Sequence, residues 1–278
     1  MATYRARVRA RNHVAAFIKS FYRRSDMSML ELTPDFIKEF AAYLSTEAGL
    51  RNGSIWANCM WLKGVVMKAH YNGLIPRNPF IQFHISPNVK EREYLTEDEL
   101  KAVMTHEFAD SKLAYIRDIF IFASFTALSF VDIQELTNDN IVEVNGEKWI
   151  LSKRHKTKVA FQVKLLDIPL QIVERYRPMQ KDNRIFPGLN YWSICKPLKR
   201  MIRECGITKS ISFHCSRHGF ATLALSTGMP IESVSRVLGH TNIVTTQLYA
   251  KITTQKLDND LTMFGDKLSK TFNGITMS

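Results

Sequence analysis

Four polar side chains follow one another near the end of this sequence: His214, Arg217, His240 and Tyr249. The first two are three residues apart, so on a helix they share a face and can point at one target. An arginine fork matches the oxygens of a phosphate, and imidazoles beside it favour an anion. A tyrosine close by can act as the nucleophile. The pattern therefore indicates a phosphate site with a covalent step.

The same residues resemble the active-site motifs of the tyrosine recombinase (phage integrase) family. His214-Cys-Ser-Arg217 reads H-x-x-R, Leu238-Gly239-His240 reads L-G-H, and Tyr249 follows nine residues later. Each fragment alone is a weak signal, but all three in order are specific. The resemblance extends over nearly the whole chain. It implies cleavage and rejoining of DNA through a 3′-phosphotyrosine, which integrates, excises or inverts a mobile segment.

Composition agrees with a nucleic-acid partner. The 278 residues carry a formal net charge of +12 and a pI of about 9.6, which favours an anionic ligand, with DNA the first candidate. With 45% hydrophobic and 23% charged residues, the chain is globular and long enough for one or two cores. The sequence shows no signal peptide, and its four cysteines lack C-x-x-C spacing. We therefore expect a reduced, cytoplasmic, nucleoid-associated bacterial protein.

Residues 1–85 predict a helical unit that resembles the family's core-binding domain. Val14, Phe17, Ile18 and Phe21 form a helical stripe, a second helix starts at Thr33-Pro34, and a third begins near Ser54. A run of basic residues accompanies the first helix. It is either a solvated face or a set of phosphate contacts, and the motifs downstream favour DNA. The residues assigned to DNA here are Arg5, Arg7, Arg9, Arg11, Lys19 and Arg23.

A polar linker over residues 86–93 leads to the expected catalytic domain, residues 94–278. Thr96 and Glu99 form a capping box, so a helix begins there. The predicted fold is mainly α with a small antiparallel β-sheet: a helical core-binding domain followed by an α+β tyrosine recombinase catalytic domain.

One position departs from the family pattern. An apolar helix over residues 117–128 leads into residues 125–136, which match the family segment T-G-L-R-x-x-E/D-L-x-x-L. Ser129 stands where the first active-site arginine is expected, and Ala127 replaces the glycine. A serine cannot neutralise a phosphate as a guanidinium does. Some conjugative-transposon integrases also lack this arginine, and the chain is similar to that branch.

A small sheet should supply two further basic groups. Residues 141–144 and 148–151 predict a hairpin around Asn145-Gly146, and residues 159–165 alternate as a third strand. The family places a catalytic lysine between its second and third strands, which we assign to Lys156, with Lys153 and Lys158 as DNA-contacting neighbours. We hypothesise that Arg154 supplies the guanidinium missing at Ser129.

The remaining elements carry the other motifs. Helices are expected at residues 169–176, 191–205, 214–225 and 230–238. Gly239 should end the last of these, and Thr241 or Asn242 should cap a further helix that holds Tyr249. Residues 257–268 are weakly amphipathic, and in the family a C-terminal helix often docks on a neighbouring subunit.

The resemblance implies a role for each polar group. Arg217 and His240 would contact the non-bridging oxygens, and His214 would orient the phosphate or accept the tyrosine proton. Lys156 would protonate the departing 5′ oxygen. No ATP, metal or other cofactor is expected. Synapsis implies a homotetramer on double-stranded DNA, with accessory DNA-bending proteins as possible partners. Residues 1–10 leave no room for an arm-binding domain, so the protein is a simpler recombinase or a shortened piece.

Other interpretations stay open at this stage. Residues 230–250 predict two helices joined by a Gly-His-Thr-Asn turn, which also resembles a helix-turn-helix. The chain could therefore be a weakened recombinase that binds DNA without cutting it. A type IB topoisomerase uses similar chemistry. Cys215 could be a catalytic thiol, and His214 with His218 could form a metal pair, although a buried cysteine and a structural histidine are commoner.

Overall fold

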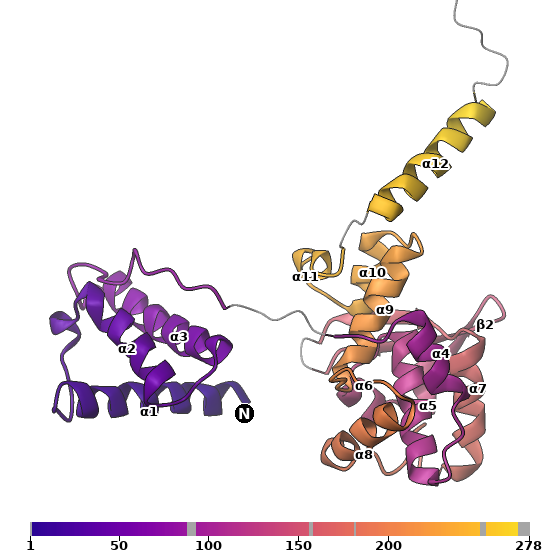
Figure 1. Ribbon diagram of the computed structural model, residues 1–278, viewed down its shortest axis with the longest axis horizontal. Helices are drawn as coiled ribbons and strands as arrows, with labels where there is room; N and C mark the ends of the chain where they lie inside the picture. The colour runs from indigo at the N-terminus through magenta and orange to yellow at the C-terminus, as the bar shows by residue number, and fades with distance from the viewer. Residues whose placement is uncertain (1, 88–92, 156–157, 181, 251–253, 272–278) are drawn as a thin grey trace, which may run out of the picture. The chain divides into compact units, whose positions relative to one another are not determined.

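The computed structural model describes the chain except residues 1, 88–92, 156–157, 181, 251–253 and 272–278. It divides into two compact units, Met1–Glu91 and Arg92–Ser278, and each is described by itself (Figure 1). Most of the predicted linker, residues 86–93, lies outside the described residues. None of the described helices combines the length and apolar character needed to span a membrane.

The first unit is helical, with α1 (Ala2–Phe21), the short 3-10 helix η1 (Met29–Glu31), α2 (Pro34–Thr46) and α3 (Asn52–Tyr71). Its core gathers aromatic rings from α1 and α2: Phe17 is fully buried and meets Phe36 edge-on at 5.2 Å. Phe21 was expected on the same stripe but is 54% exposed, because the helix ends there. Thr33 occupies the N-cap of α2 as predicted, but its side chain makes no capping hydrogen bond.

The second unit is a helical domain with one small sheet. Its elements are α4 (Glu97–Thr105), α5 (Ser111–Thr126), α6 (Phe130–Gln134), η2 (Asn138–Asn140), β1 (Ile141–Val144), β2 (Glu147–Lys153), β3 (Ala160–Lys164), α7 (Asp167–Tyr176), η3 (Arg177–Met179), α8 (Tyr191–Glu204), α9 (His214–Ser226), α10 (Ile231–Leu238), α11 (Val244–Gln247) and α12 (Thr254–Thr271). The prediction of a mainly helical protein with a small antiparallel sheet is confirmed.

Helix α5 lies at the centre of this unit and packs against α4, α7, α8 and α9 (Figure 1). It is apolar on nearly every side, and Ile119, Phe120, Phe122 and Ala123 are almost completely buried. A helix that is hydrophobic all round belongs in a core. The helix ends at Ala127, whose left-handed backbone (φ 56°) turns the chain toward α6.

The sheet has the order β1-β2-β3, and both pairs are antiparallel. Val144 pairs with Glu147, so Asn145 and Gly146 form a two-residue turn, with φ values of 53° and 77°. Positive φ at both positions is the signature of a type I′ turn, as the sequence predicted. The link from β2 to β3 then carries the basic residues of interest.

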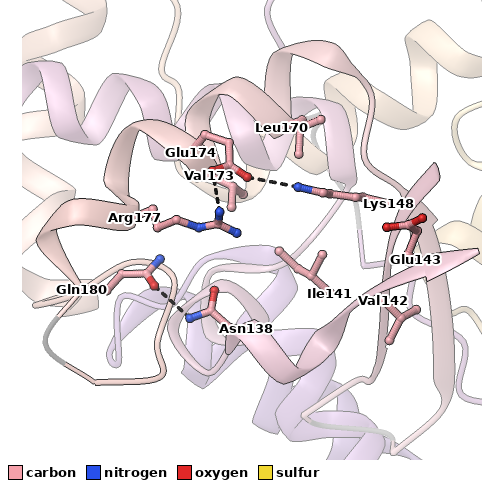
Figure 2. A pocket seen from close by; sticks show the side chains of 10 residues that line it. All are labelled: Asn138, Ile141, Val142, Glu143, Lys148, Leu170, Val173, Glu174, Arg177 and Gln180. Atoms are coloured by element: carbon pink, nitrogen blue, oxygen red, sulfur yellow. Dashed lines mark hydrogen bonds and ion pairs between the residues drawn. The ribbon is translucent and has the colours of Figure 1, made fainter. Parts of the chain in front are cut away.

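A pocket opens on the side of this sheet that faces α7 (Figure 2). Glu174 lies at its wall, accepts a hydrogen bond from Lys148 Nζ at 3.2 Å, and forms an ion pair with Arg177 Nη1 at 3.1 Å. Asn138 Nδ2 donates to Gln180 Oε1 at 2.8 Å beside them. The side chains of the phosphate motifs do not line this pocket. Of the polar side chains drawn in Figure 2, all but Glu143 are paired with one another.

Candidate active site

Arg217 is held between the ends of two helices. It lies in the first turn of α9 and is 8% exposed. Its Nη1 donates to Ala127 O at 2.7 Å and its Nη2 donates to Leu238 O. Carbonyls at helix ends lack intrahelical partners, so a guanidinium satisfies them well. Burial, and then the charge of Arg154, lower the pKa of Arg217 to about 10.

Arg154 lies beside Arg217, although sixty-three positions separate them in sequence. It follows β2, is 6% exposed, and its Nη2 donates to Val237 O at 2.6 Å. The two arginines therefore bind consecutive carbonyls at the end of α10. The Arg154 guanidinium also lies 4.0 Å from the centroid of the Phe161 ring. Burial lowers its pKa, and the charge of Asp132 offsets part of that effect.

One carboxylate connects Arg154 to Ser129. Asp132 Oδ2 accepts from Arg154 Nη1 and from Ser129 Oγ, both at 2.7 Å, and Asp132 Oδ1 accepts from His155 N at 3.1 Å. Ser129 is the N-cap of α6 and forms a capping box with Asp132. Burial alone would raise the pKa of Asp132, but these hydrogen bonds and the Arg154 charge together hold it below its usual value. Arg154 and Ser129 thus bind the same carboxylate oxygen of Asp132.

Gly239 leaves the space that Arg154 occupies. Its backbone is left-handed (φ 61°) and ends α10, as predicted. A Cβ at this position would lie 2.8 Å from Arg154 Nε and 3.0 Å from Arg154 Cγ. Arg154 Nε is buried and has no hydrogen-bond partner among the described residues. The glycine of the L-G-H motif therefore serves both the turn and the arginine beside it.

His240 follows directly and is held by a buried threonine. Its backbone N donates to Ser235 O at 3.0 Å, and its Nδ1 lies 2.9 Å from Thr246 Oγ1. Burial lowers the pKa of His240 to about 4, and the charges of Arg217, Arg154 and His214 add to the effect. The ring is therefore neutral near pH 7, and Nε2 is the nitrogen left for a ligand.

Tyr249 lies in a turn, so the prediction that it falls on a helix is wrong. Helix α11 is a single turn, Val244–Gln247, and Tyr249 N donates to Thr246 O at 3.0 Å after it. Asn242 Oδ1 accepts from Val244 N at 2.9 Å, but the N-cap of α11 is Ile243, so the prediction that Thr241 or Asn242 holds the cap is wrong. The Tyr249 side chain is half-buried and packs on a small apolar cluster that includes Ala221 and Leu225 of α9.

Two histidines on α9 lie next to this tyrosine. His214 is exposed at the start of the helix, and its ring centroid is 4.7 Å from that of His218. His218 is 8% exposed and its ring centroid is 5.1 Å from that of Tyr249. Within the described ranges, no group of three metal-ligating side chains is present, so no third ligand joins His214 and His218 there.

Of the three predicted lysines, two are described by the structure and one is not. Lys156 lies outside the described residues. Lys153 and Lys158 on either side are exposed. The turn between them is closed by Arg154 N donating to Val159 O and by Lys158 N donating to Arg154 O, both at 2.8 Å. These bonds position Arg154 at the base of the turn.

The basic residues assigned to DNA in the first unit are all exposed: Arg5, Arg7, Arg9, Arg11, Lys19 and Arg23. Arg5 and Arg9 share one face of α1, and Arg7 and Arg11 share another, since residues four apart are neighbours on a helix. The ion pairs found in the described part of the chain use none of these six. Their charges are therefore presented to solvent.

Sequence reasoning missed two residues of the site. Asp132 was part of a motif but had no role, although the Ser129-x-x-Asp132 spacing is that of a capping box and could have suggested one. His218 was considered only as a metal ligand, and no local pattern predicts its contact with Tyr249. That contact depends on how α9 and the turn after α11 meet.

Comparison with known sequences now decides the family. Residues 93–256 match the sequence model of the Phage integrase family, and residues 1–85 match the Phage integrase SAM-like domain. The chain belongs to the phage integrase family. It is thus a tyrosine recombinase, as its motifs predicted.

Curated relatives agree with this assignment. Tyrosine recombinase XerA of Pyrococcus horikoshii is 32% identical over 177 residues, which are 59% of this chain and 58% of that protein. Tyrosine recombinase XerC of Lactobacillus leichmannii is 25% identical over 229 residues, 77% of each chain. This chain therefore matches a little over half the length of the first relative and about three quarters of the length of the second.

Solved structures show the same fold. The Tn1549 transposon integrase in complex with a circular intermediate DNA has a TM-score of 0.76 at 18% identity, with 91% of this chain and 92% of that chain covered. A lambda integrase dimer bound to a COC′ core site has a TM-score of 0.66 at 18% identity, covering 86% and 87%. At 18% identity, both likenesses show the shared fold alone.

Proposed function

We propose that this tyrosine recombinase carries out site-specific DNA recombination with Tyr249 as nucleophile, and that it integrates, excises or inverts a mobile DNA segment. The observation that carries the proposal is the pair of buried guanidiniums of Arg154 and Arg217. They bind consecutive carbonyls beside His240. Asp132 pairs with Arg154, but none of the ion pairs among the described residues involves Arg217. Two buried cations side by side are costly with a single counter-charge, and a phosphodiester would supply the second anion.

The reaction is a phosphoryl transfer that conserves the energy of the phosphodiester bond. Tyr249 Oη attacks the phosphorus, the bond to the 5′ oxygen breaks, and a 3′-phosphotyrosine forms. His214 accepts the phenolic proton and Lys156 protonates the departing 5′ oxygen. Attack by the 5′ hydroxyl of a partner strand reverses these steps and joins the new strands. The step therefore consumes no ATP.

Arg217 and His240 stabilise the negative charge of the pentacoordinate transition state. Arg217 is preorganised, because two backbone carbonyls fix its guanidinium before DNA arrives. His240 is neutral at pH 7, so Nε2 donates a hydrogen bond without adding a third full charge to the buried arginines. Preorganised donors in a dry site are worth more than the same groups in water.

Arg154 takes the place of the arginine missing at Ser129. Its unpartnered Nε, its burial and its bond to Asp132 support this role. Loss of one preorganised donor typically costs about 10²–10³-fold in rate. We expect Arg154→Ala to slow cleavage by that order and Arg154→Lys to recover little, because a lysine has one nitrogen in place of the planar fork that reaches Asp132 with Nη1 and Val237 O with Nη2.

The exposed arginines of α1, with Lys19, Arg23, Lys153 and Lys158, contact DNA phosphates. In this proposal residues 1–85 are the core-binding domain, residues 86–93 the linker and residues 94–278 the catalytic domain. The division of the chain at Glu91 and the two family matches support these boundaries. The solved relatives bound to DNA support double-stranded DNA as the substrate.

Helix α12 supports an oligomer. Its exposed apolar side chains Leu257, Leu261, Phe264 and Leu268 recur at spacings of four, three and four residues, which forms one stripe. We assign this stripe to a neighbouring subunit within a tetramer on DNA. The assembly would work in the bacterial cytoplasm on the nucleoid, with DNA-bending proteins as optional partners.

A suicide substrate tests the proposal. A nicked duplex that carries the crossover site of the protein's own mobile element is incubated with wild type and with Tyr249→Phe. A shifted wild-type band on a denaturing gel, absent with Tyr249→Phe, is the expected result. Intact DNA binding without any covalent band would support the alternative of a weakened, binding-only protein. Relaxation of supercoiled plasmid without strand exchange would support the topoisomerase alternative.

A further inference from the structure

His218 is a buried polar side chain of α9 to which the proposed reaction gives no role. It is 8% exposed and lies one residue after Arg217 and one helical turn after His214. A buried imidazole carries a desolvation cost, so its place needs a physical reason. Its neighbours suggest one, because its ring centroid lies 4.7 Å from His214 and 5.1 Å from Tyr249.

Tyr249 differs from the other polar groups of the site in the element that carries it. Arg217 is fixed by two carbonyls, and His240 by Thr246. Tyr249 instead lies in a turn after a helix of four residues, with Thr246 the buried side chain of that helix. Such a short element does little to orient a side chain beyond its end. The surface next to Tyr249 includes α9, which supplies the His218 ring and Ala221, Ala224 and Leu225 of the small apolar cluster, while α10 supplies Val234 and Leu238.

We propose that His218 is a positioning residue, whose buried ring holds the phenol of Tyr249 in place for attack on the phosphate. The inference deepens the proposed function and rests on Tyr249 as nucleophile. The two rings are inclined at 43°, a tilted contact within the usual range for paired aromatic rings. Because α9 also carries Arg217, the same helix then sets both the nucleophile and the phosphate-binding guanidinium.

The consequence for rate follows from the geometry of attack. A nucleophile must lie about 3–3.5 Å from its target, and a misplacement of about 1 Å can cost about 10²-fold. His218→Ala removes the ring contact and with it one restraint on the position of the Tyr249 phenol. We expect covalent complex formation to slow by about 10- to 100-fold. Affinity for DNA should stay unchanged, because His218 is buried and contacts no phosphate in this scheme.

The test compares His218→Ala, His218→Phe and His218→Gln on the suicide substrate at saturating DNA, with native gels for binding and thermal unfolding for stability. Phenylalanine keeps a ring without nitrogens, and glutamine keeps an N–H donor without a ring. Ser216→Ala is the matched control, since Ser216 is also buried on α9 but its Oγ donates to Phe213 O. The expected order of rates is wild type, then phenylalanine close to it, then glutamine and alanine far below.

Several results would overturn the inference. Wild-type rates in His218→Ala would show that the ring is not needed. A glutamine variant that cleaves as fast as or faster than the phenylalanine variant would show that a nitrogen matters and not the ring contact, even if His218→Ala does not fold. A loss that follows DNA affinity or melting temperature would assign a structural role. Absence of a covalent complex in wild type would instead reject the proposed function, and this inference with it.

Discussion

Replacement of Gly239 by alanine should damage the site through Arg154. Gly239 has a left-handed backbone, and its missing Cβ leaves room for the Arg154 side chain. An added methyl carbon would lie 2.8 Å from Nε and 3.0 Å from Cγ of that side chain, which is closer than carbon tolerates. Arg154 cannot simply turn away, because it is buried and bonded to Asp132 and Val237 O.

The cost has two parts that can be separated. A non-glycine residue in the left-handed region costs about 1–2 kcal/mol. Displacement of Arg154 would weaken a hydrogen bond to a charged group, worth about 1.5–3 kcal/mol. The free energy of unfolding of Gly239→Ala should therefore fall by about 2.5–5 kcal/mol. Cleavage should slow by about 10²-fold if Arg154 moves by about 1 Å from the phosphate.

Gly206→Ala is the matched control. Gly206 follows α8 with a φ of 75°, and a Cβ there would meet nothing within 4 Å. It carries the backbone strain without the clash, so its unfolding free energy should fall by about 1–2 kcal/mol while cleavage stays at the wild-type rate. Urea unfolding and covalent complex formation on the suicide substrate measure the two effects. Equal stability and equal cleavage in the two variants would refute the role given to Arg154.

Three further outcomes are expected. Asp132→Asn should lower the free energy of unfolding by about 3 kcal/mol, because it leaves a buried guanidinium without its counter-charge; urea unfolding that matches wild type would contradict this. His240 has a folded pKa of about 4 against 6.5 ordinarily, so between these pH values the unfolded state binds the extra proton and stability falls as pH falls. His240→Gln should flatten that slope by up to about one proton, and an unchanged slope would exclude the effect. Joint replacement of Arg5 and Arg9 by alanine should weaken binding to all DNA sequences. It should also reduce the slope of the logarithm of affinity against the logarithm of salt concentration by about one per lost phosphate contact. Lys38→Ala, which removes an ion-paired lysine of α2, is the control, and an equal loss of affinity there would reject specific contacts.

Local signals in the sequence were enough for most elements. The type I′ hairpin at Asn145-Gly146, the capping box of Thr96 and the left-handed stop at Gly239 were all predicted and are present. Each depends on backbone preferences within four residues, which a single sequence displays directly. The order and spacing of the phosphate motifs likewise indicated the correct family.

Local signals failed where neighbouring elements compete. The sequence extended the helix after Asn242 through Tyr249, but the helix stops at Gln247. Short helices are marginal by themselves, so their ends are set by what packs against them. Phe21 was placed in the core by its periodicity, yet it is more than half exposed at the end of α1.

By itself, the sequence determined the family and the order of the candidate active-site residues, and it predicted the helix that carries His214 and Arg217 and the turn at Gly239. Only the tertiary structure decided that Arg154 lies beside Arg217, that Asp132 joins Arg154 to Ser129, and that His218 meets Tyr249. The physical reason is separation along the chain. Arg217 bonds to Ala127, ninety residues away, and such a contact depends on how whole helices pack and not on any local preference.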